Sequence, residues 1–266
     1  MSEKAGRVLI IAGSDSGGGA GVQADIKTVT ALGGHAASAI TAVTVQNTLG
    51  VHDVHPIPPL IIAAQIRTVL SDIGADAIKT GMMGDAAAIA AVLEALADYR
   101  HIPLVVDPVM IAKGGVSLLA EGALEPLRRL MARAALVTPN APEAAVLTGV
   151  AIATTDDLRA AGDQLLTSGV GAVLMKGGHV PGDSVIDLLM TPTGETVLEG
   201  PRIDTRHTHG TGCTLASACA AGLAQGLRLE DAVARGWAYT GEAIRRAPGF
   251  GAGAGPLDHA WPMRDR

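Results

Sequence analysis

Aromatic side chains are scarce in this 266-residue sequence: two tryptophans, two tyrosines and one phenylalanine make up 2% of it. A single-stranded nucleic acid therefore finds few aromatic faces on which successive bases could stack. Positive charge is not concentrated either, since the formal net charge is -6 and no block of lysine and arginine occurs. Broad nucleic-acid and membrane-surface binding both need concentrated positive charge, so neither is predicted. An anionic ligand would have to be held locally.

Cysteine and long hydrophobic runs are also lacking. Cys213 and Cys219 are the two cysteines, and their six-residue separation would put them on different faces of one helix, which excludes a disulfide framework. The apolar run 8–12 is too short for a signal peptide, and no stretch reaches membrane-spanning length. Together these absences predict a reducing, cytoplasmic setting.

What is present suits a globular α/β protein, with 48% hydrophobic and 17% charged residues. Runs rich in Val and Ile predict six buried strands, and helical patterns lie between them. This alternation predicts a three-layer α/β/α sandwich with a central, mainly parallel sheet. No repeat or linker divides the chain, so residues 1–266 are predicted to form a single domain. The predicted strands are 7–12, 37–45, 77–80, 104–107, 135–138 and 172–176, with a hairpin at 185–190 and 196–198; the predicted helices are 21–32, 60–73, 85–100, 118–132, 143–147, 156–168, 211–225 and 229–246.

Polar residues and glycines collect where these strands end. In open parallel sheets, ligands bind at the carboxyl ends of the strands, so this clustering predicts one cleft. Turn formation alone would explain the glycines but not the two lysines and the Asp-Pro pair. The segments are 13–15, 46–47, 79–81, 107–108, 138–140 and 176–178.

The first glycine-rich loop, 13–21, follows a strand and opens a helix, where backbone N–H groups can meet a ligand. It is not a Walker A loop, because no Gly-Lys-Ser/Thr closes it. Residues 19–24 match the dinucleotide pattern formally, yet the first glycine lies well past the strand and no acid ends the next strand. A ligand role and a plain flexible turn both stay open, whereas a dehydrogenase is disfavoured.

The second glycine-rich turn contains Gly210, Thr211, Gly212 and Cys213, directly before an apolar helix. Its N–H groups can converge on one point with the helix dipole behind them, which forms an anion hole. A transferring phosphoryl group needs such a hole more than a strong base, because its transition state is loose. An ordinary glycine-rich helix start remains the alternative.

Cys213 lies in the first turn of that helix, where a lowered thiol pKa would make it a possible proton acceptor. A small buried hydrophobe is the alternative, and it is the role expected of Cys219. Cys213 with His207 and His209 has no recognised zinc-ligand spacing, so no zinc site is predicted.

Three charged residues follow strands and suit a phosphate and its metal. Lys176 can reach phosphate oxygens as a point charge, or it can be a solvated strand-end lysine. Asp107 and Glu143 can hold Mg²⁺, directly or through water, because this ion usually takes one or two carboxylates. Glu143 can equally be a first-turn acid favoured by the helix dipole.

The order of these motifs resembles the hydroxymethylpyrimidine/phosphomethylpyrimidine kinases of thiamine biosynthesis, within the ribokinase-like superfamily. The resemblance runs from about Arg7 to the Gly-rich tail. The segments that carry it are 12–15, 18–25, 40–43, 46–48, 79–82, 107–110, 138–140, 142–144, 175–179 and 208–214.

The resemblance implies a ribokinase-like fold, ATP and Mg²⁺, and two successive phosphorylations of 4-amino-5-hydroxymethyl-2-methylpyrimidine. It also implies that this small molecule is the partner, together with a second copy of the chain in a homodimer. Cys213 stands where related sugar kinases carry a catalytic Asp. By the same resemblance, Gly210, Thr211 and Gly212 form the anion hole; Gln46, Asp25, Gly13, Val43, Met82 and Val109 bind the substrate; Lys176, Asn140 and Thr208 bind ATP; and Asp107 and Glu143 support Mg²⁺.

The sequence departs from the family in the first loop, where Ser16 and Gly17 replace a Pro-Ser pair that relatives commonly show. This predicts a more flexible loop. Relatives that act on pyridoxal-type rings make a pyridoxal kinase the alternative activity. A regulatory module that binds ATP without turning it over, and an oxidoreductase, are the other classes left open.

Overall fold

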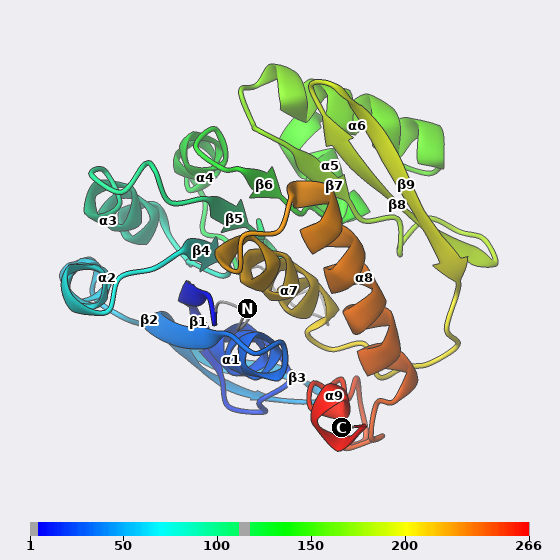
Figure 1. Ribbon diagram of the computed structural model, residues 1–266, viewed down its shortest axis with the longest axis horizontal. Coiled ribbons are helices and arrows are strands. Elements are labelled where there is room, and N and C mark those ends of the chain that lie inside the picture. The colour runs from blue at the N-terminus through cyan, green and yellow to red at the C-terminus, as the bar shows by residue number, and fades with distance from the viewer. Residues whose placement is uncertain (1–4, 112–117, 266) are drawn as a thin grey trace.

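The computed structural model describes residues 5–111 and 118–265. Its strands are β1 (Arg7–Asp15), β2 (His35–Asn47), β3 (Gly50–Pro56), β4 (Ala77–Thr80), β5 (Leu104–Val106), β6 (Leu136–Val137), β7 (Val173–Met175), β8 (Ser184–Thr191) and β9 (Gly194–Pro201). They join into one sheet in the order β3-β2-β1-β4-β5-β6-β7-β8-β9 (Figure 1). The six strands from β2 to β7 in this order run parallel, and antiparallel pairs occur only at the two sides. The mainly parallel sheet predicted from the sequence is confirmed.

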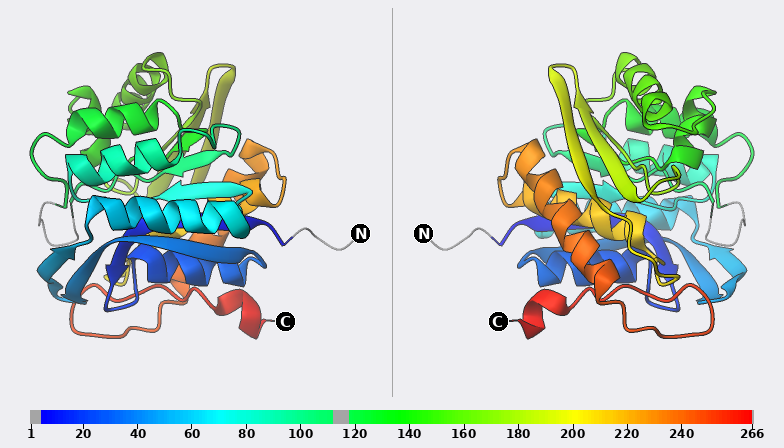
Figure 2. Two further views of the ribbon diagram at one scale, coloured as in Figure 1. Left: turned by 90° about the vertical axis from the view of Figure 1, so that its left-hand side faces the viewer. Right: turned by 90° about the vertical axis from the view of Figure 1, so that its right-hand side faces the viewer.

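Helices cover both faces of the sheet (Figure 2). They are α1 (Gly21–Ala31), α2 (Pro59–Asp72), α3 (Ala86–Ala95), α4 (Leu124–Met131), α5 (Ala141–Thr148), α6 (Thr155–Thr167), α7 (Thr211–Ala224), α8 (Leu229–Arg245) and α9 (Trp261–Arg264). One core cluster packs α2 to α6 on one face, and a second packs α1, α7 and α8 on the other. This is the predicted three-layer sandwich. Among the described residues, no helix has both the length and the apolar character needed to cross a bilayer.

The central strand β1 shows why the sequence reads as a continuous apolar run. Val8 and Ile10 pack into the cluster under α1 and α7, whereas Leu9 and Ile11 pack into the cluster on the opposite face. Successive side chains of a strand point to opposite faces, so both faces of β1 are covered and both need apolar residues.

β1 also marks the point where the chain changes direction across the sheet. The chain runs from β1 outward to β2 and β3 on one side, and then returns past β1 to β4 on the other side. A crevice at the carboxyl ends of the strands is expected at such a switch point. The carboxyl ends of β1 and β4 carry Asp15, Lys79 and Thr80 there.

The sequence did not predict β3, the edge strand that pairs antiparallel with β2. Most of β3 is exposed, and it carries His52, Asp53 and His55, so it lacks the apolar pattern of a buried strand. An exposed edge strand can pair with another chain, and charged side chains on it oppose such pairing. The short α9 was also missed.

Two predicted helices were too long. The helix expected over 118–132 begins at Leu124, because Leu119 bridges to Gly84 and Gly122 has a left-handed φ of +80°. The helix expected over 85–100 ends at Ala95.

Candidate active site

The structure brings the polar strand ends together, as predicted for parallel strands. Lys176 Nζ lies 3.1 Å from Asp107 Oδ1, and Thr138 Oγ1 donates to the same oxygen at 3.1 Å. These three residues follow β7, β5 and β6, respectively. The Lys176 side chain is only 12% exposed. The solvated-lysine alternative is therefore wrong.

The charge of Lys176 is secured by its neighbours. Burial lowers the pKa of its ammonium group, but Asp107 and Glu143 more than offset this, so the pKa lies above its ordinary value. A lysine that stays protonated is a fixed positive charge. Such a charge suits an anionic group at this edge of the sheet.

The turn before α7 is both a glycine helix start and part of this cluster. Gly210 caps α7 with a φ of +83°, and a Cβ there would overlap the carbonyl oxygen of Gly19 in the first loop. Only glycine tolerates both conditions. A Cβ on Gly212 would lie 3.0 Å from Lys176 Nζ and 3.4 Å from Asp107 Oδ2. The first turn of α7 thus faces the Lys176–Asp107 pair, with the positive end of the helix dipole toward it.

Thr208 and Thr211 shape this turn from within. The Thr211 hydroxyl donates to the Thr208 carbonyl oxygen at 2.8 Å, and Thr214 donates to the Gly210 carbonyl oxygen at 2.8 Å. Both threonines before Gly212 are half-buried. The turn is therefore held in shape by its own side chains.

Glu143 is a first-turn acid of α5, which is one of the two roles that the sequence left open. It forms a capping box with Asn140, in which each side chain accepts a hydrogen bond from the other residue's backbone N–H at 2.9 Å. Burial raises the pKa of Glu143 to about 7; Asp107 adds to this shift, and Lys176 opposes it. Two neighbouring carboxylates, one of them reluctant to ionise, fit a divalent cation with its own waters. Within the described residues no cluster of three metal-ligating side chains occurs.

This pKa gives a testable pH dependence of stability. Between pH 4.5 and about 7 the unfolded chain has lost the Glu143 proton while the folded chain retains it, so the free energy of unfolding falls as pH rises. We expect Glu143→Gln to flatten this decline, because an amide does not titrate in this pH range. The glutamine oxygen can still accept a hydrogen bond from the Asn140 N–H, so the cap is kept. Urea unfolding from pH 5 to 7.5 without divalent cations measures it. Parallel declines in the two proteins would contradict the raised pKa.

Cys213 is half-buried, and its pKa shift is opposite to the one considered from sequence. Burial raises the pKa of the thiol to about 12, and the Lys79 ammonium group offsets this only in part. The thiol is therefore neutral near pH 7. Cys219 is fully buried among the residues of α7 and α8, as predicted.

Asp25, which the resemblance implied as a substrate contact, lies beneath the site instead. Its side chain and that of Lys79 are both 0% exposed and form an ion pair with both Oδ–Nζ distances at 2.8 Å. Ser217 donates to Asp25 Oδ1 at 2.7 Å. Ser217 lies about one turn of α7 after Cys213. The buried Asp25–Lys79 ion pair therefore contacts α7 just beyond the turn that carries the thiol.

The other residues implied as substrate contacts differ in their burial. The Met82 side chain packs against Gly13, where a Cβ would overlap it. Val109 is half-buried after Asp107, whereas Val43 is 44% exposed on β2. Gln46 is the second-last residue of β2 and is half-buried.

Ser16 ties the first loop to β2. Its hydroxyl accepts from the Gln46 N–H and donates to the Gln46 carbonyl oxygen, both at 2.8 Å. Asp15 accepts from the backbone N–H groups of Gly17, Gly19 and Ala20. The replacement of Pro by Ser16 therefore gives the loop a specific anchor rather than the flexibility predicted from the sequence.

His209 contacts both the first loop and Gln46, which the sequence did not predict. Its Nε2 lies 2.9 Å from Asp15 Oδ2 and 3.2 Å from Gln46 Nε2. The Gly-rich tail braces it, since the His209 N–H donates to the Gly255 carbonyl oxygen at 3.1 Å. A hollow of about 240 Å³ opens beside it, lined by Gln46, Asn47, Thr48, Leu49, Gly50, His209, Gly253 and Ala254. Its position directly before Gly210 was the one sequence signal available.

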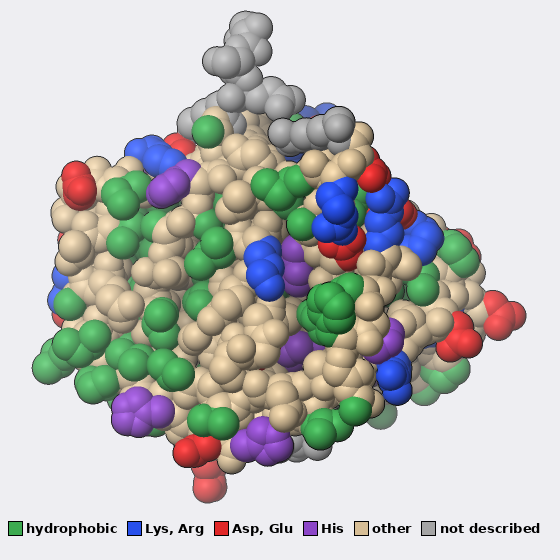
Figure 3. Space-filling model, turned by 90° about the horizontal axis from the view of Figure 1, so that it is seen from below, with side chains coloured by type: hydrophobic (Ala, Val, Ile, Leu, Met, Phe, Trp, Pro, Cys, Tyr) green, Lys and Arg blue, Asp and Glu red, His purple; other side chains and the backbone are tan. Residues whose placement is uncertain are grey.

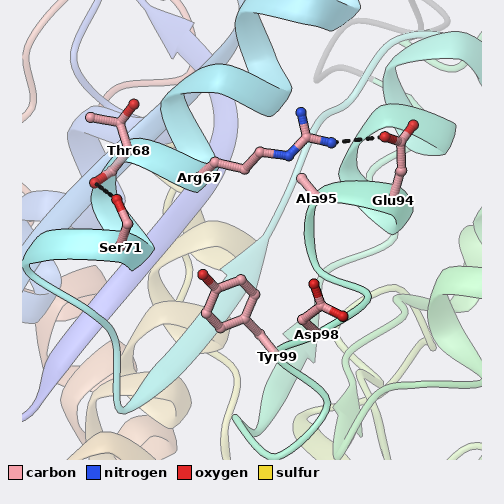
Figure 4. Close-up of a pocket in the computed structure, with 7 residues that line it drawn as sticks. All are labelled: Arg67, Thr68, Ser71, Glu94, Ala95, Asp98 and Tyr99. Carbon is pink, nitrogen blue, oxygen red and sulfur yellow. Dashed lines mark hydrogen bonds and ion pairs between the residues drawn. The ribbon is translucent and has the colours of Figure 1, made fainter.

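A larger hollow of about 580 Å³ lies elsewhere, between the ends of α2 and α3 (Figure 4). An Arg67–Glu94 ion pair of 2.8 Å crosses it. The carboxyl ends of these helices lie at the amino ends of the strands, away from the Lys176 cluster. None of the predicted site residues lines it.

Comparison with known proteins identifies the family. Residues 15–258 match the family model described as phosphomethylpyrimidine kinase. The hydroxymethylpyrimidine/phosphomethylpyrimidine kinase of Streptomyces coelicolor is 49% identical over 257 residues, which cover 96% of this chain and 95% of that protein. The thiamine biosynthesis bifunctional protein ThiED of Geobacter sulfurreducens is 48% identical over 265 residues, covering 98% of this chain; the match spans 54% of that longer protein.

A solved structure agrees with this result. The pyridoxal kinase of Bacillus subtilis, determined as an ADP complex, superposes with a TM-score of 0.91 at 33% identity, covering 99% of this chain and 100% of that one. The resemblance seen in the sequence is confirmed: this chain belongs to the phosphomethylpyrimidine kinase family and is a phosphotransferase with a ribokinase-like fold.

Proposed function

We propose that this chain transfers the γ-phosphoryl group of ATP to 4-amino-5-hydroxymethyl-2-methylpyrimidine, and then phosphorylates the monophosphate to the diphosphate for thiamine synthesis. The Streptomyces relative carries both kinase activities in its name, and the ADP complex of the pyridoxal kinase supports ATP as the donor. The observation that carries the proposal is the approach of Lys176 and Asp107 to Gly212 in the first turn of α7.

In this proposal, the first turn of α7 receives the transferring phosphoryl group. The N–H groups after Gly210 and the helix dipole stabilise its equatorial oxygens, and Lys176 neutralises charge shared with the leaving group. Asn140 and Thr208 stand at the ATP side by family resemblance.

Asp107 and Glu143 would hold Mg²⁺ here. The ion supplies charge neutralisation between the phosphate groups when it is bound. Burial raises the pKa of Glu143, and the nearby Asp107 carboxylate adds to the shift, so a cation between the two groups would favour the ionised form of Glu143. Lys176 already contacts Asp107 Oδ1, which leaves Asp107 Oδ2 toward Gly212.

Cys213 would hold the hydroxymethyl group through its neutral thiol rather than act as a preformed thiolate. In a loose transition state, the hydroxyl group that accepts the phosphoryl group keeps most of its proton until the bond to phosphorus forms. We expect Cys213→Ala to lower kcat by about 10²-fold, because the loss of a group that positions the acceptor carries effects of this order. We also expect Cys213 to react slowly with iodoacetamide at pH 8.5. Fast alkylation at that pH would show a thiolate and contradict the neutral-thiol role.

Asp187 is a positioning residue for Lys176 in this scheme. It is 5% exposed on β8 and accepts from the Gly177 N–H at 2.7 Å and from Trp237 Nε1 at 3.0 Å. Without it, Gly177 loses the contact that fixes the chain beside Lys176.

We expect Asp187→Ala to lower kcat/KM for ATP by roughly 10- to 100-fold, because small displacements of a catalytic group carry effects of this order. Trp237→Phe removes one of the two donors and leaves Gly177 held, so it serves as the control. Steady-state kinetics and Tm are measured together. A lower Tm with unchanged kcat/KM would reduce Asp187 to a structural role.

Pyridoxal kinase activity is the second candidate, favoured by the close superposition on a pyridoxal kinase. Both substrates are small heteroaromatic rings that carry a hydroxymethyl group. ADP release measured with the pyrimidine, its monophosphate and pyridoxal in parallel ranks the activities. A kcat/KM for pyridoxal above that for the pyrimidine would reverse the order proposed here.

We also propose that the chain works in the cytoplasm as a homodimer. Exposed apolar side chains gather on the β2–β3 hairpin and the start of α2, among them Val45 at 56% and Leu60 at 83% exposure. Hydrophobic side chains collect at the lower left of the face seen in Figure 3, on the side where α2 lies in Figure 1. A second copy covering this patch would bury it.

Light scattering tests the dimer. We expect Val45→Lys combined with Leu60→Lys to yield monomers. Val197→Lys changes another exposed apolar residue, on β9, and should leave the dimer intact. A monomeric wild-type chain would contradict the proposal.

A further inference from the structure

The hydrogen bonds around His209 determine which of its ring nitrogens carries a proton. Asp15 is 3% exposed and accepts from three backbone N–H groups in addition to His209. A carboxylate with this many donors is ionised and can only accept. Burial raises the pKa of Asp15, but the hydrogen bonds from His209 and the backbone outweigh burial, so the pKa lies below its ordinary value. This agrees with an ionised carboxylate. The Nε2 atom of His209, 2.9 Å from Asp15 Oδ2, must therefore carry a hydrogen and donate it.

This assignment conflicts with the Gln46 amide as placed. Gln46 Nε2 lies 3.2 Å from the same His209 Nε2, so two N–H groups would face each other. The two ends of a Gln amide are interchangeable in shape, and their orientation is assigned from the hydrogen bonds around them. With the amide turned over, its oxygen accepts from His209 and the contact becomes favourable.

Thr44 leads to the same orientation independently. Its hydroxyl lies 2.9 Å from the Ser14 carbonyl oxygen and 3.2 Å from Gln46 Oε1, both of which are acceptors. One hydroxyl hydrogen cannot fully serve both. With the amide turned over, Thr44 donates to Ser14 and accepts from the Gln46 NH₂ group. The chain Asp15–His209–Gln46–Thr44–Ser14 then has a donor and an acceptor at every contact.

We propose that His209, fixed by Asp15, sets the orientation of the Gln46 amide and thereby selects rings that carry an amino group next to a ring nitrogen. Gln46 then presents an acceptor on the His209 side and a donor on the Thr44 side. An exocyclic amino group donates to the first and the adjacent ring nitrogen accepts from the second. A ring with a carbonyl in place of the amino group offers the opposite pattern and is rejected. For its ligand, this inference rests on the proposed function.

The rigidity of the surroundings supports a selective role. The Gln46 backbone is clamped by Ser16, so the amide cannot adapt by moving its strand end. The His209 ring is only 12% exposed, and a Cβ on Gly19 would lie 2.6 Å from its Cδ2. Discrimination by a fixed donor–acceptor pair is stronger than discrimination by shape, because the wrong ring leaves buried polar groups unpaired.

The kinetic test compares the 4-amino substrate with its 4-oxo analogue. We expect wild-type kcat/KM to favour the amino ring by about 10²-fold or more. His209→Phe keeps a planar ring but frees the amide, so the ratio should fall by roughly tenfold or more, with KM for the amino ring raised and KM for ATP unchanged. Thr44→Val removes the other anchor and should change the ratio in the same direction. An unchanged ratio in both active variants would overturn the proposal.

A second measurement needs neither a variant nor turnover. Long-range ¹⁵N–¹H NMR of the ¹⁵N-histidine-labelled full chain reports which ring nitrogen of His209 is protonated. We expect a proton on Nε2. A neutral ring protonated only at Nδ1 would overturn the proposal. If the wild type phosphorylates neither ring, the proposed function fails, whereas the NMR result still decides the orientation.

Discussion

Replacing Asp25 with alanine should lower the free energy of unfolding by about 3–5 kcal/mol, because it leaves the Lys79 ammonium group buried without its partner. The pair is 0% exposed on both sides and joins β4, α1 and, through Ser217, α7. Burial lowers the pKa of Lys79, but Asp25 and other nearby groups raise it above its ordinary value, so the lysine remains charged when paired. Chemical denaturation at pH 7 measures the loss.

The control for Asp25 is an ion pair of similar length at the surface. Arg67 and Glu94 lie 2.8 Å apart but are 52% and 76% exposed. Glu94→Ala should change stability by about 1 kcal/mol or less, as exposed pairs do. The double variant Asp25→Leu/Lys79→Met removes both charges and should recover part of the stability lost in Asp25→Ala. If Asp25→Ala and Glu94→Ala lower the free energy of unfolding equally, the buried pair contributes no more to stability than the exposed pair.

Replacing Lys176 with methionine should lower kcat by about 10²–10³-fold, the loss expected when one preorganised group that stabilises transition-state charge is removed. The side chain keeps most of its length, but the positive charge beside Gly212 disappears and Asp107 loses its lysine partner. Single-turnover kinetics with saturating ATP isolates the chemical step from nucleotide binding.

Two further variants bracket this result. Lys176→Arg retains the charge and should lose less activity than Lys176→Met. Arg159→Met removes an exposed cation that pairs with Glu195 on the far side of the sheet, and its kcat should remain near that of the wild type. A Lys176→Met enzyme with wild-type kcat would exclude the proposed role of the cluster.

The fold could be predicted where burial is symmetrical. β1 is covered on both faces, so its sequence is continuously apolar and the strand was predicted. β3 was missed because an exposed edge strand needs no apolar pattern, and its polar residues resemble a loop. The predicted helix ends were wrong where a local backbone conformation stops the helix, as the left-handed Gly122 does before α4.

The site also contains contacts that the sequence could predict and contacts that it could not. Lys176 and Asp107 follow parallel strands, so topology alone brings them to one edge, and their convergence was predicted. The contacts of Asp25 and His209 were not predicted, since their partners are distant in sequence: Ser217 lies 192 residues from Asp25, and Asp15 lies 194 residues from His209. Only packing of α7 against β1 and α1 reveals such pairs. The single-domain organisation stays a prediction.

The most direct test of the proposed activity is the stoichiometry of ADP release. Purified chain is incubated with excess ATP, Mg²⁺ and a limiting amount of hydroxymethylpyrimidine, and ADP is counted at completion. We predict two ADP per pyrimidine, and one ADP per molecule when the monophosphate is supplied instead. ADP release no higher than in reactions without a pyrimidine would contradict the assignment of this site as a hydroxymethylpyrimidine kinase.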